Sequence, residues 1–430
     1  MIQTIVADGR AEYAFLEKMQ ERITETDSKV TATVSDILEN VRRRGDEAVR
    51  EYTLRFDGHC PDCFEVSREE INDALTEADS AFVDALLNAQ QNIADFHARQ
   101  KQQAFVTTKE NGVILGQRIR GLHRVGIYVP GGTAAYPSTV LMNAVPAKIA
   151  GVGELVMVTP PGKDGKANPD ILTAAAIAGV DRVFLMGGAQ AVGALAYGTA
   201  SVPAVDKIVG PGNIFVATAK KLLYGVVDID MIAGPSEILV MADQSAEPEF
   251  LAADLMSQAE HDRLASAILL TTSREIGEKT CTAISRQLEK LSRKEMIESA
   301  LDNYGAIFLC DCTAKMVELA NRIAPEHLEV MMENPMEYIG KLDNAGSVFL
   351  GRYAPEPLGD YYAGPNHVLP TSGTARFFSP LSVDSFVKKS SFIYYTEEAL
   401  REASGDIVAI ANREGLTAHA NSITVRFEDR

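Results

Sequence analysis

The sequence of 430 residues is short of basic residues and of long apolar runs, and each shortage excludes a class of protein. It carries 41 Lys and Arg against 59 Asp and Glu, a formal net charge of −18. A nucleic-acid backbone or an anionic membrane surface needs clustered Lys and Arg, so we expect neither as a partner. No apolar run approaches the roughly 20 residues that span a bilayer. Asp8 and Arg10 interrupt the start of the chain too early for a signal peptide.

Cysteine is also scarce, with five residues in the whole chain. An odd number at low density is typical of reduced thiols, which predicts a cytoplasmic protein. Neither Cys60-Pro-Asp-Cys63 nor Cys310-Asp-Cys312 has the surroundings of a redox pair or a zinc site, and Cys281 stands alone. No cysteine follows a glycine-rich strand end, where an aldehyde oxidation through a thiol would need one.

The rest of the composition is that of an ordinary globular protein, with 46% hydrophobic and 23% charged residues. A length of 430 residues is enough for two or three domains. Apolar residues at three- and four-residue steps predict helices over the first hundred residues. From 122 to 240, short apolar runs alternate with Ala-rich stretches, the pattern of an α/β domain with parallel strands. A second α/β unit follows, then a Gly- and Pro-rich ordered loop at 351–380, and a small helical or mixed tail.

Several apolar runs end in glycine, as in VGIYVPGG, RVFLMGGAQ, DKIVGPGN and IAGPSE. The dinucleotide fingerprint G-x-G-x-x-G is absent, and GGAQAVG lacks the Lys-Ser/Thr of a P-loop. In an open parallel sheet such strand ends share one rim, where backbone N–H groups can approach a phosphate. The pattern favours nucleotide binding at this rim.

His261 lies in the segment DLMSQAEHD. On a helix, Asp254, Gln258 and His261 fall at i, i+4 and i+7, which places them in one polar stripe. An imidazole nitrogen and an amide oxygen at this spacing could bind one metal ion. A solvated helix face would have the same spacing, so both readings stay open.

Two further segments place a carboxylate close to a histidine. Glu326 and His327 are adjacent in APEHLEV, either an acid/base pair or unrelated surface groups. Asp360 lies in the Gly- and Pro-rich loop, seven residues before His367, where it could bind a metal or a substrate ammonium. His419, five residues after Glu414, is uninformative alone.

Together these segments resemble one family, the histidinol dehydrogenases. The resemblance runs in unbroken order from about residue 20 to GLTAHANSI. It rests on VGIYVPGGTAAYPSTVLMNAVPAKIAGV, GPGNIFVATAKKLLYG, IAGPSEILVMAD, DLMSQAEHD, APEHLEV and the long segment from AGSVFLGRYAPEPLGDYY to TSGTARFFSPLSV.

The resemblance implies an α/β fold of two incomplete Rossmann-like domains with N- and C-terminal extensions, related to the aldehyde dehydrogenase-like fold. The implied division is an extension at 1–21, a zinc and substrate domain at 22–121 plus 238–381, an NAD-binding domain at 122–237 and a tail at 382–430. The implied protein is a homodimer whose tail contributes to the partner's active site.

The implied activity is NAD-dependent oxidation of L-histidinol, through L-histidinal, to L-histidine, the last steps of histidine biosynthesis, with one zinc ion per subunit. Residue by residue, the resemblance implies zinc ligands at Gln258, His261, Asp360 and His419, and an acid/base pair of Glu326 and His327. Ser236 and Glu414 would join the zinc ligands and His327 in binding the substrate, and Tyr128, Gln190 and Asn213 would contact NAD.

Two alternatives use the same residues differently. A metal-dependent hydrolase would activate water at the same metal site and would work without NAD. A non-catalytic binding protein would keep its function when Glu326 and His327 are replaced by Gln and Asn.

Overall fold

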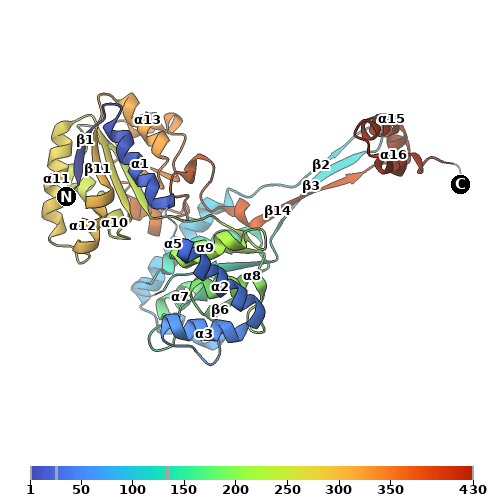
Figure 1. Ribbon diagram of the computed structural model, residues 1–430, viewed down its shortest axis with the longest axis horizontal. Helices are drawn as coiled ribbons and strands as arrows, with labels where there is room; N and C mark the ends of the chain where they lie inside the picture. The colour runs from blue at the N-terminus through green and yellow to red at the C-terminus, as the bar shows by residue number, and fades with distance from the viewer. Residues whose placement is uncertain (1, 25–27, 132–134, 429–430) are drawn as a thin grey trace.

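The computed structural model describes residues 2–24, 28–131 and 135–428. Two α/β units and a long arm make up the chain (Figure 1). One unit holds a six-stranded parallel sheet with strand order β1-β11-β10-β9-β12-β13, and the other a five-stranded parallel sheet with order β6-β5-β4-β7-β8. The arm is built on a three-stranded antiparallel sheet, β14-β3-β2. The expectation of parallel sheets flanked by helices is confirmed.

The five-stranded unit takes its strands from the middle of the chain. They are β4 (Arg124–Tyr128), β5 (Glu154–Thr159), β6 (Arg182–Leu185), β7 (Lys207–Val209) and β8 (Asp228–Ile229). Its helices are α2 (Ser28–Arg44), α3 (Asp46–Asp57), α4 (Arg68–Glu77), α5 (Ser80–Ala98), α6 (Pro137–Ala150), α7 (Pro169–Ala178), α8 (Gly188–Tyr197) and α9 (Ile214–Leu223).

The six-stranded unit combines the N-terminus with the region after residue 236. Its strands are β1 (Gln3–Val6), β9 (Glu237–Ala242), β10 (Ser266–Thr271), β11 (Gly305–Leu309), β12 (His327–Met331) and β13 (Ser347–Leu350). Its helices are α1 (Ala11–Thr24), α10 (Pro248–Ala259), α11 (Arg274–Leu288), α12 (Lys294–Tyr304), α13 (Thr313–Ile323) and α14 (Glu356–Tyr361), with the 3₁₀ segments η1 (Pro335–Lys341) and η2 (Thr374–Arg376). A third 3₁₀ segment, η3 (Val383–Phe386), packs against α6 of the five-stranded unit.

The arm carries the end of the chain away from both sheets (Figure 1). Strand β3 (Ile114–Gly121) pairs with β2 (Phe105–Thr108) on one side and with β14 (Val387–Tyr394) on the other. The helices α15 (Glu397–Arg413) and α16 (Thr417–Thr424) lie at the far end of the arm. The helical or mixed tail expected from sequence therefore begins with a strand. Its partner, β3, lies far earlier in the chain.

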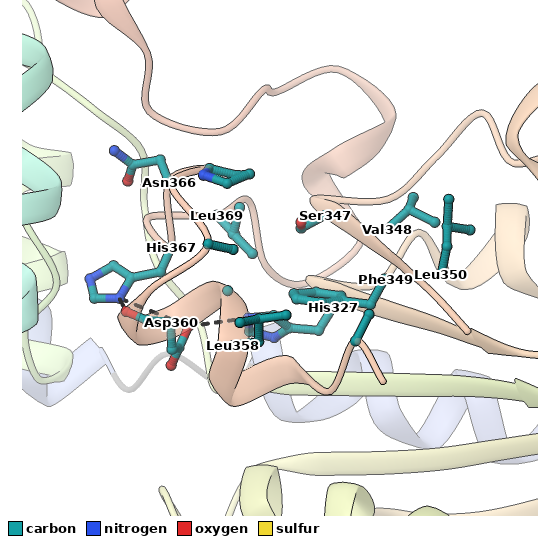
Figure 2. Close-up of a pocket in the computed structure, with 14 residues that line it drawn as sticks. His327, Ser347, Val348, Phe349, Leu350, Leu358, Asp360, Asn366, His367 and Leu369 are labelled. Atoms are coloured by element: carbon teal, nitrogen blue, oxygen red, sulfur yellow. Dashed lines mark hydrogen bonds and ion pairs between the residues drawn. The ribbon is translucent and has the colours of Figure 1, made fainter. Parts of the chain in front are cut away.

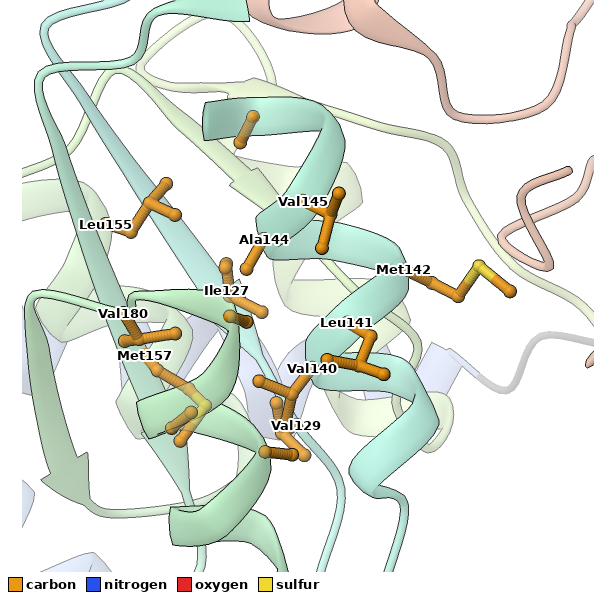
Figure 3. Close-up of a cluster of buried hydrophobic side chains, with 14 of the residues drawn as sticks. Ile127, Val129, Val140, Leu141, Met142, Ala144, Val145, Leu155, Met157 and Val180 are labelled. Carbon is orange, nitrogen blue, oxygen red and sulfur yellow. The ribbon is translucent and has the colours of Figure 1, made fainter. Parts of the chain in front are cut away.

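Burial explains the short apolar runs of the sequence. Every residue of β9, β10, β11 and β12 is buried, because helices cover both faces of the sheet. In the other unit, α6 packs its apolar side chains against β4 and β5 (Figure 3). Ile127, Val140 and Leu155 in this cluster are at most 1% exposed.

Local signals set the helix ends, as α7 illustrates. The side chain of Asn168 accepts hydrogen bonds from the N–H groups of Asp170 and Ile171, and Pro169 occupies the first helical position. Gly179 ends the helix in the left-handed conformation, with φ of 71°. Helix α7 thus lies in one of the Ala-rich stretches that the sequence pattern places between the strands.

The packing of the first hundred residues differs from the division implied by the resemblance. Helices α2 to α5 contact α6 to α9, so they cover the five-stranded sheet, whereas the expected division grouped 22–121 with 238–381. Strand β1 pairs with β11, which makes the expected N-terminal extension part of the six-stranded sheet.

Two further expectations concern the whole chain. The five cysteines are free. Within residues 2–24, 28–131 and 135–428, no helix is long and apolar enough to cross a bilayer.

Candidate active site

The expected acid/base pair lies at the start of β12, the strand between β9 and the edge strand β13 of the six-stranded sheet. Glu326 and His327 are 8% and 4% exposed. The N–H of Glu237 donates to Glu326 Oε2 at 2.9 Å, and the carbonyl oxygen of Glu237 lies 3.1 Å from His327 Nδ1. Since a carbonyl only accepts, Nδ1 must carry a hydrogen, and Nε2 faces the rest of the site. The two side chains are 3.6 Å apart, so they are not unrelated surface groups.

Helix α14 brings two carboxylates opposite this imidazole. His327 Nε2 lies 3.8 Å from Asp360 Oδ1 and 3.9 Å from Glu356 Oε1. His367 Nδ1 donates to the carbonyl oxygen of Asp360 at 3.0 Å and lies 3.9 Å from its Oδ1 (Figure 2). The Gly- and Pro-rich segment is thus an ordered wall of the site, built on a short helix.

A group of possible metal ligands forms where α10 and α14 meet. His261, Glu356 and Asp360 each offer one ligand atom, and these atoms lie within 4.8 Å of one another. The amide oxygen of Gln258 is buried without a hydrogen-bond partner, and Gln258 lines a cavity together with His261 and Asp360. Imidazole, amide and carboxylate donors suit Zn²⁺, so the residues present fit the implied metal.

The expected stripe on α10 is placed nearly as predicted. Asp254 and Gln258 lie on the helix, and His261 follows just past its last residue, Ala259. Asp254 and Gln258 are 8% and 1% exposed, so the solvated-face interpretation is wrong for these two, whereas His261 is exposed.

Burial and charge shift the pKa values of the acid/base pair. Burial raises the pKa of Glu326 to about 7, even though the neighbouring His327 opposes the shift. Burial lowers the pKa of His327, but the carboxylates of Glu326, Asp360 and Glu356 outweigh it and raise the pKa to about 10.

The carboxyls of α14 are shifted in opposite directions. Burial raises the pKa of Asp360, but its interactions with His327 and His367 prevail and lower it to about 2. Burial and the charge of Asp360 raise the pKa of Glu356 to about 8. At neutral pH, Asp360 is therefore an ionised carboxylate beside His327, whereas Glu356 favours its protonated form.

A cavity of about 290 Å³ opens beside these groups, between the two sheets. From the six-stranded unit it is lined by Ser236, Gln258, His261, Glu326, His327 and Asp360, and from the glycine-marked rim of the five-stranded unit by Gly210, Gly212 and Asn213. The structure thus brings together most of the residues predicted for metal, substrate and proton transfer.

A larger cavity of about 920 Å³ adjoins it on the five-stranded side, and Pro130 and Asn213 line both. Tyr128 and Gln190 line the larger one. Gln190 is completely buried, yet neither its amide oxygen nor its amide nitrogen has a partner. A ligand with hydroxyl or amide groups would satisfy both atoms.

On the other side of His327 and Asp360 is a mostly apolar pocket of about 270 Å³ (Figure 2). Phe349, Leu358 and Leu369 contribute to its walls. Sequence reasoning did not predict this pocket, because its walls come from β13, α14 and the following loop, which approach one another only in the folded chain.

Glu414 and His419 are not at this site. Both are exposed, at the end of α15 and on α16, and these helices lie at the far end of the arm (Figure 1). Neither lines the cavity that contains Gln258 and Asp360. Within one subunit, the two are therefore separated from the residues with which the resemblance groups them.

Sequence reasoning missed Glu356 and left His367 without a role. The signal available for Glu356 was its spacing, because EPLGD places two carboxylates at i and i+4, the same face of a helix. A six-residue helix inside a Gly- and Pro-rich loop gives too little periodicity to reveal that spacing.

Comparison with known proteins identifies the family. The sequence model described as histidinol dehydrogenase matches residues 20–427. The chain is 57% identical to the histidinol dehydrogenase of Clostridium acetobutylicum, with 99% of each chain covered, and 54% identical to that of Listeria innocua, with 98% of each covered. The solved structure of histidinol dehydrogenase from Elizabethkingia anophelis superposes with a TM-score of 0.92 at 38% identity, over 99% of this chain and 98% of that one. The chain is therefore a member of the histidinol dehydrogenase family of oxidoreductases.

Proposed function

We propose that the protein oxidises L-histidinol to L-histidine with two NAD⁺, through L-histidinal that stays bound. The observation that carries the proposal is the junction of two cavities. The smaller cavity contains the imidazole of His327, the carboxyl of Glu326 and a set of possible metal ligands. The larger cavity has room for a dinucleotide, and Pro130 and Asn213 line both cavities. This junction would place a nicotinamide beside His327.

The proposed proton transfers use the buried pair. His327 in its neutral form accepts the hydroxyl proton at Nε2 as the first hydride leaves the carbinol carbon, with Nδ1 held by the carbonyl of Glu237. A metal ion held by Asp360 would offset the carboxylate charge that raises the pKa of this imidazole and so favour the neutral form. The aldehyde has no second hydride to give until water adds to it. Glu326 takes a proton from that water, and the hydrate then loses hydride and proton to give the carboxylate. This route needs no cysteine.

Zinc would be held by Gln258, His261, Asp360 and the partner subunit's His419. When bound, it would supply a Lewis acid that fixes the imidazole and amine of histidinol. Ser236 lines the cavity and would contact the substrate together with the partner subunit's Glu414. Tyr128, Gln190 and Asn213 would contact NAD.

The proposed homodimer accounts for the arm. Its exposed apolar side chains need a partner surface; they include Phe392, Ile393 and Tyr394 on β14, and Ile410 and Leu416 near the far end. If a second subunit covers these side chains, Glu414 and His419 of the arm would reach the active site of that second subunit, because they lie far from the site of their own chain. The five free cysteines support a cytoplasmic location, and the net charge of −18 gives no support for nucleic-acid or membrane binding.

The test is the ratio of NADH formed to L-histidinol consumed, measured on zinc-loaded protein with excess NAD⁺. We expect two. A ratio of one would show that the reaction stops at the aldehyde and that the role of Glu326 is wrong. No NADH from protein with verified zinc would refute the proposed use of NAD.

A further inference from the structure

A buried pair of carboxyls lies behind the site and takes no part in the proposed chemistry. Asp254 is on α10 and Glu329 on β12, and they are 8% and 1% exposed. Two acids without a neighbouring cation are costly to bury, so their contacts need an explanation.

Glu329 links β12 to α14. It follows His327 by two residues, so both side chains project from the same face of the strand. Its Oε1 accepts a hydrogen bond of 2.8 Å from the N–H of Glu356, the first residue of α14. Pro355 provides no side-chain cap for that helix, so a strand residue does so instead.

The same side chain links β12 to α10. Glu329 Oε2 is buried and accepts no hydrogen bond from an N–H group, and the side chain that faces Glu329 from α10 is the carboxyl of Asp254. A hydrogen bond between two carboxyls requires one proton. Burial raises the pKa of Asp254 to about 6 and that of Glu329 well above its usual value, which agrees with a shared proton.

The three elements joined in this way are the ones that carry the site. Asp254 lies one turn before Gln258 and two turns before His261, and α14 carries Asp360. A second link runs parallel to the first, since Ser257 Oγ donates to Glu356 Oε2 at 3.3 Å.

We propose that Asp254 and Glu329 are positioning residues, which set the distance between the ligands on α10 and Asp360 on α14. This inference rests on the zinc site of the proposed function. The proposed role depends on the length of the Glu329 side chain and on its hydrogen bonds, and not on its charge. It therefore predicts different effects for two small substitutions, Glu329→Gln and Glu329→Asp.

Glu329→Gln keeps an oxygen for the N–H of Glu356 and adds an N–H for Asp254. Glu329→Asp keeps the acid, but it is one methylene too short to reach both partners. We expect Glu329→Asp to weaken zinc binding about 10- to 100-fold, the usual effect of disturbing the groups around a metal ligand, and to raise the KM for histidinol more than it lowers kcat. Glu329→Gln should bind zinc within about twofold of the unaltered protein.

Zinc affinity is measured on the metal-free protein by competition with a chromogenic chelator, and circular dichroism checks folding. Glu12→Asp is the matched control. Glu12 is also fully buried and accepts from the N–H of Gly9 at 2.9 and 3.0 Å, but it lies on α1, outside the cavity. It should lose stability and keep its zinc affinity.

The variants Asp254→Asn and Asp254→Ala make the same comparison on α10. We expect the Asp254→Asn protein to bind zinc as tightly as the unaltered protein and the Asp254→Ala protein to bind it more weakly. Failure of the unaltered protein to bind zinc would refute the proposed function. If it binds zinc, the positioning role is overturned when Glu329→Gln weakens binding as much as Glu329→Asp, or when Asp254→Ala binds as tightly as Asp254→Asn.

Discussion

At the scale of residues, the site depends on two adjacent side chains, Glu326 and His327, that the backbone of a single residue, Glu237, orients. The N–H of Glu237 holds Glu326 and its carbonyl holds His327, so the carboxyl and the imidazole face the same cavity from fixed positions. Adjacent side chains on a regular strand point to opposite faces. Glu326 precedes the first residue of β12, and this break in the strand lets both reach the site.

Glu326→Gln separates the two oxidations. Gln can still accept from the N–H of Glu237, but it cannot take a proton from water. We expect hydrate formation, and with it oxidation of L-histidinal, to slow by about 10²- to 10⁴-fold, while oxidation of L-histidinol to the aldehyde changes far less. Stopped-flow absorbance of NADH should show one equivalent formed quickly and the second slowly. Glu337→Gln, at an exposed position, is the control. Equal slowing of both equivalents would contradict the assignment.

A second residue-scale prediction concerns pH and the buried His97. Burial lowers the pKa of its imidazole, which is completely inaccessible and lies 2.7 Å from Gln100 Oε1. Because the folded state holds this histidine neutral, its contribution to stability is present above the unfolded pKa of about 6.5 and is lost as the pH falls, when the unfolded chain takes up the proton. The free energy of unfolding should therefore fall more steeply between pH 7 and pH 5 in the unaltered protein than in His97→Gln.

Urea unfolding at a series of pH values measures this slope. His59→Gln, at an exposed position, should leave the slope unchanged. A slope that His97→Gln does not reduce would show that His97 is not the group that makes folding sensitive to acid.

At the scale of elements, the predictable parts were those with local signals. The period of α10 placed Gln258 near His261, and glycine-ended apolar runs located the rim of the five-stranded sheet. The pairing of β14 with β3 gave no such signal, because β14 is mostly exposed and its partner precedes it by more than 260 residues. The position of Glu356 was equally hidden, since it depends on how α14 docks against β12.

The arm makes its own prediction at Gly116, in the middle of β3. A Cβ there would lie 2.8 Å from the carbonyl oxygen of Phe105 and would collide with the ring of Phe392. Gly116→Val should therefore disturb the pairing of β3 with both neighbours, and overpacking of this kind costs about 1–3 kcal/mol. We expect a loss of dimer and of activity while both α/β units stay folded.

Sedimentation velocity reports the dimer, and near-ultraviolet circular dichroism reports the folded units. Gly405→Val, on α15, is the matched control, because a Cβ at that position meets nothing within 4 Å. A Gly116→Val protein that remains dimeric and fully active would show that the arm tolerates the insertion and is not essential for assembly.

At the scale of the whole molecule, the proposed dimer requires each active site to use two chains. A site built in this way would take His261 from one subunit and His419 from the other. A His261→Asn chain and a His419→Asn chain should each be nearly inactive alone. In a mixed dimer, one site would combine both defects, and the other would combine the intact His261 of one chain with the intact His419 of its partner.

Random mixing of equal amounts makes half of the dimers mixed, with one working site of two, so activity should recover to about one quarter of the unaltered level. The chains are mixed after reversible dissociation, and NADH formation is followed with saturating L-histidinol and zinc. Two His419→Asn preparations mixed together are the control and should recover nothing. If the mixture of different variants also recovers nothing, although sedimentation shows that mixed dimers form, then His419 acts within its own chain. In that case the arm must fold back onto its own subunit, a conformation unlike the extended one in Figure 1.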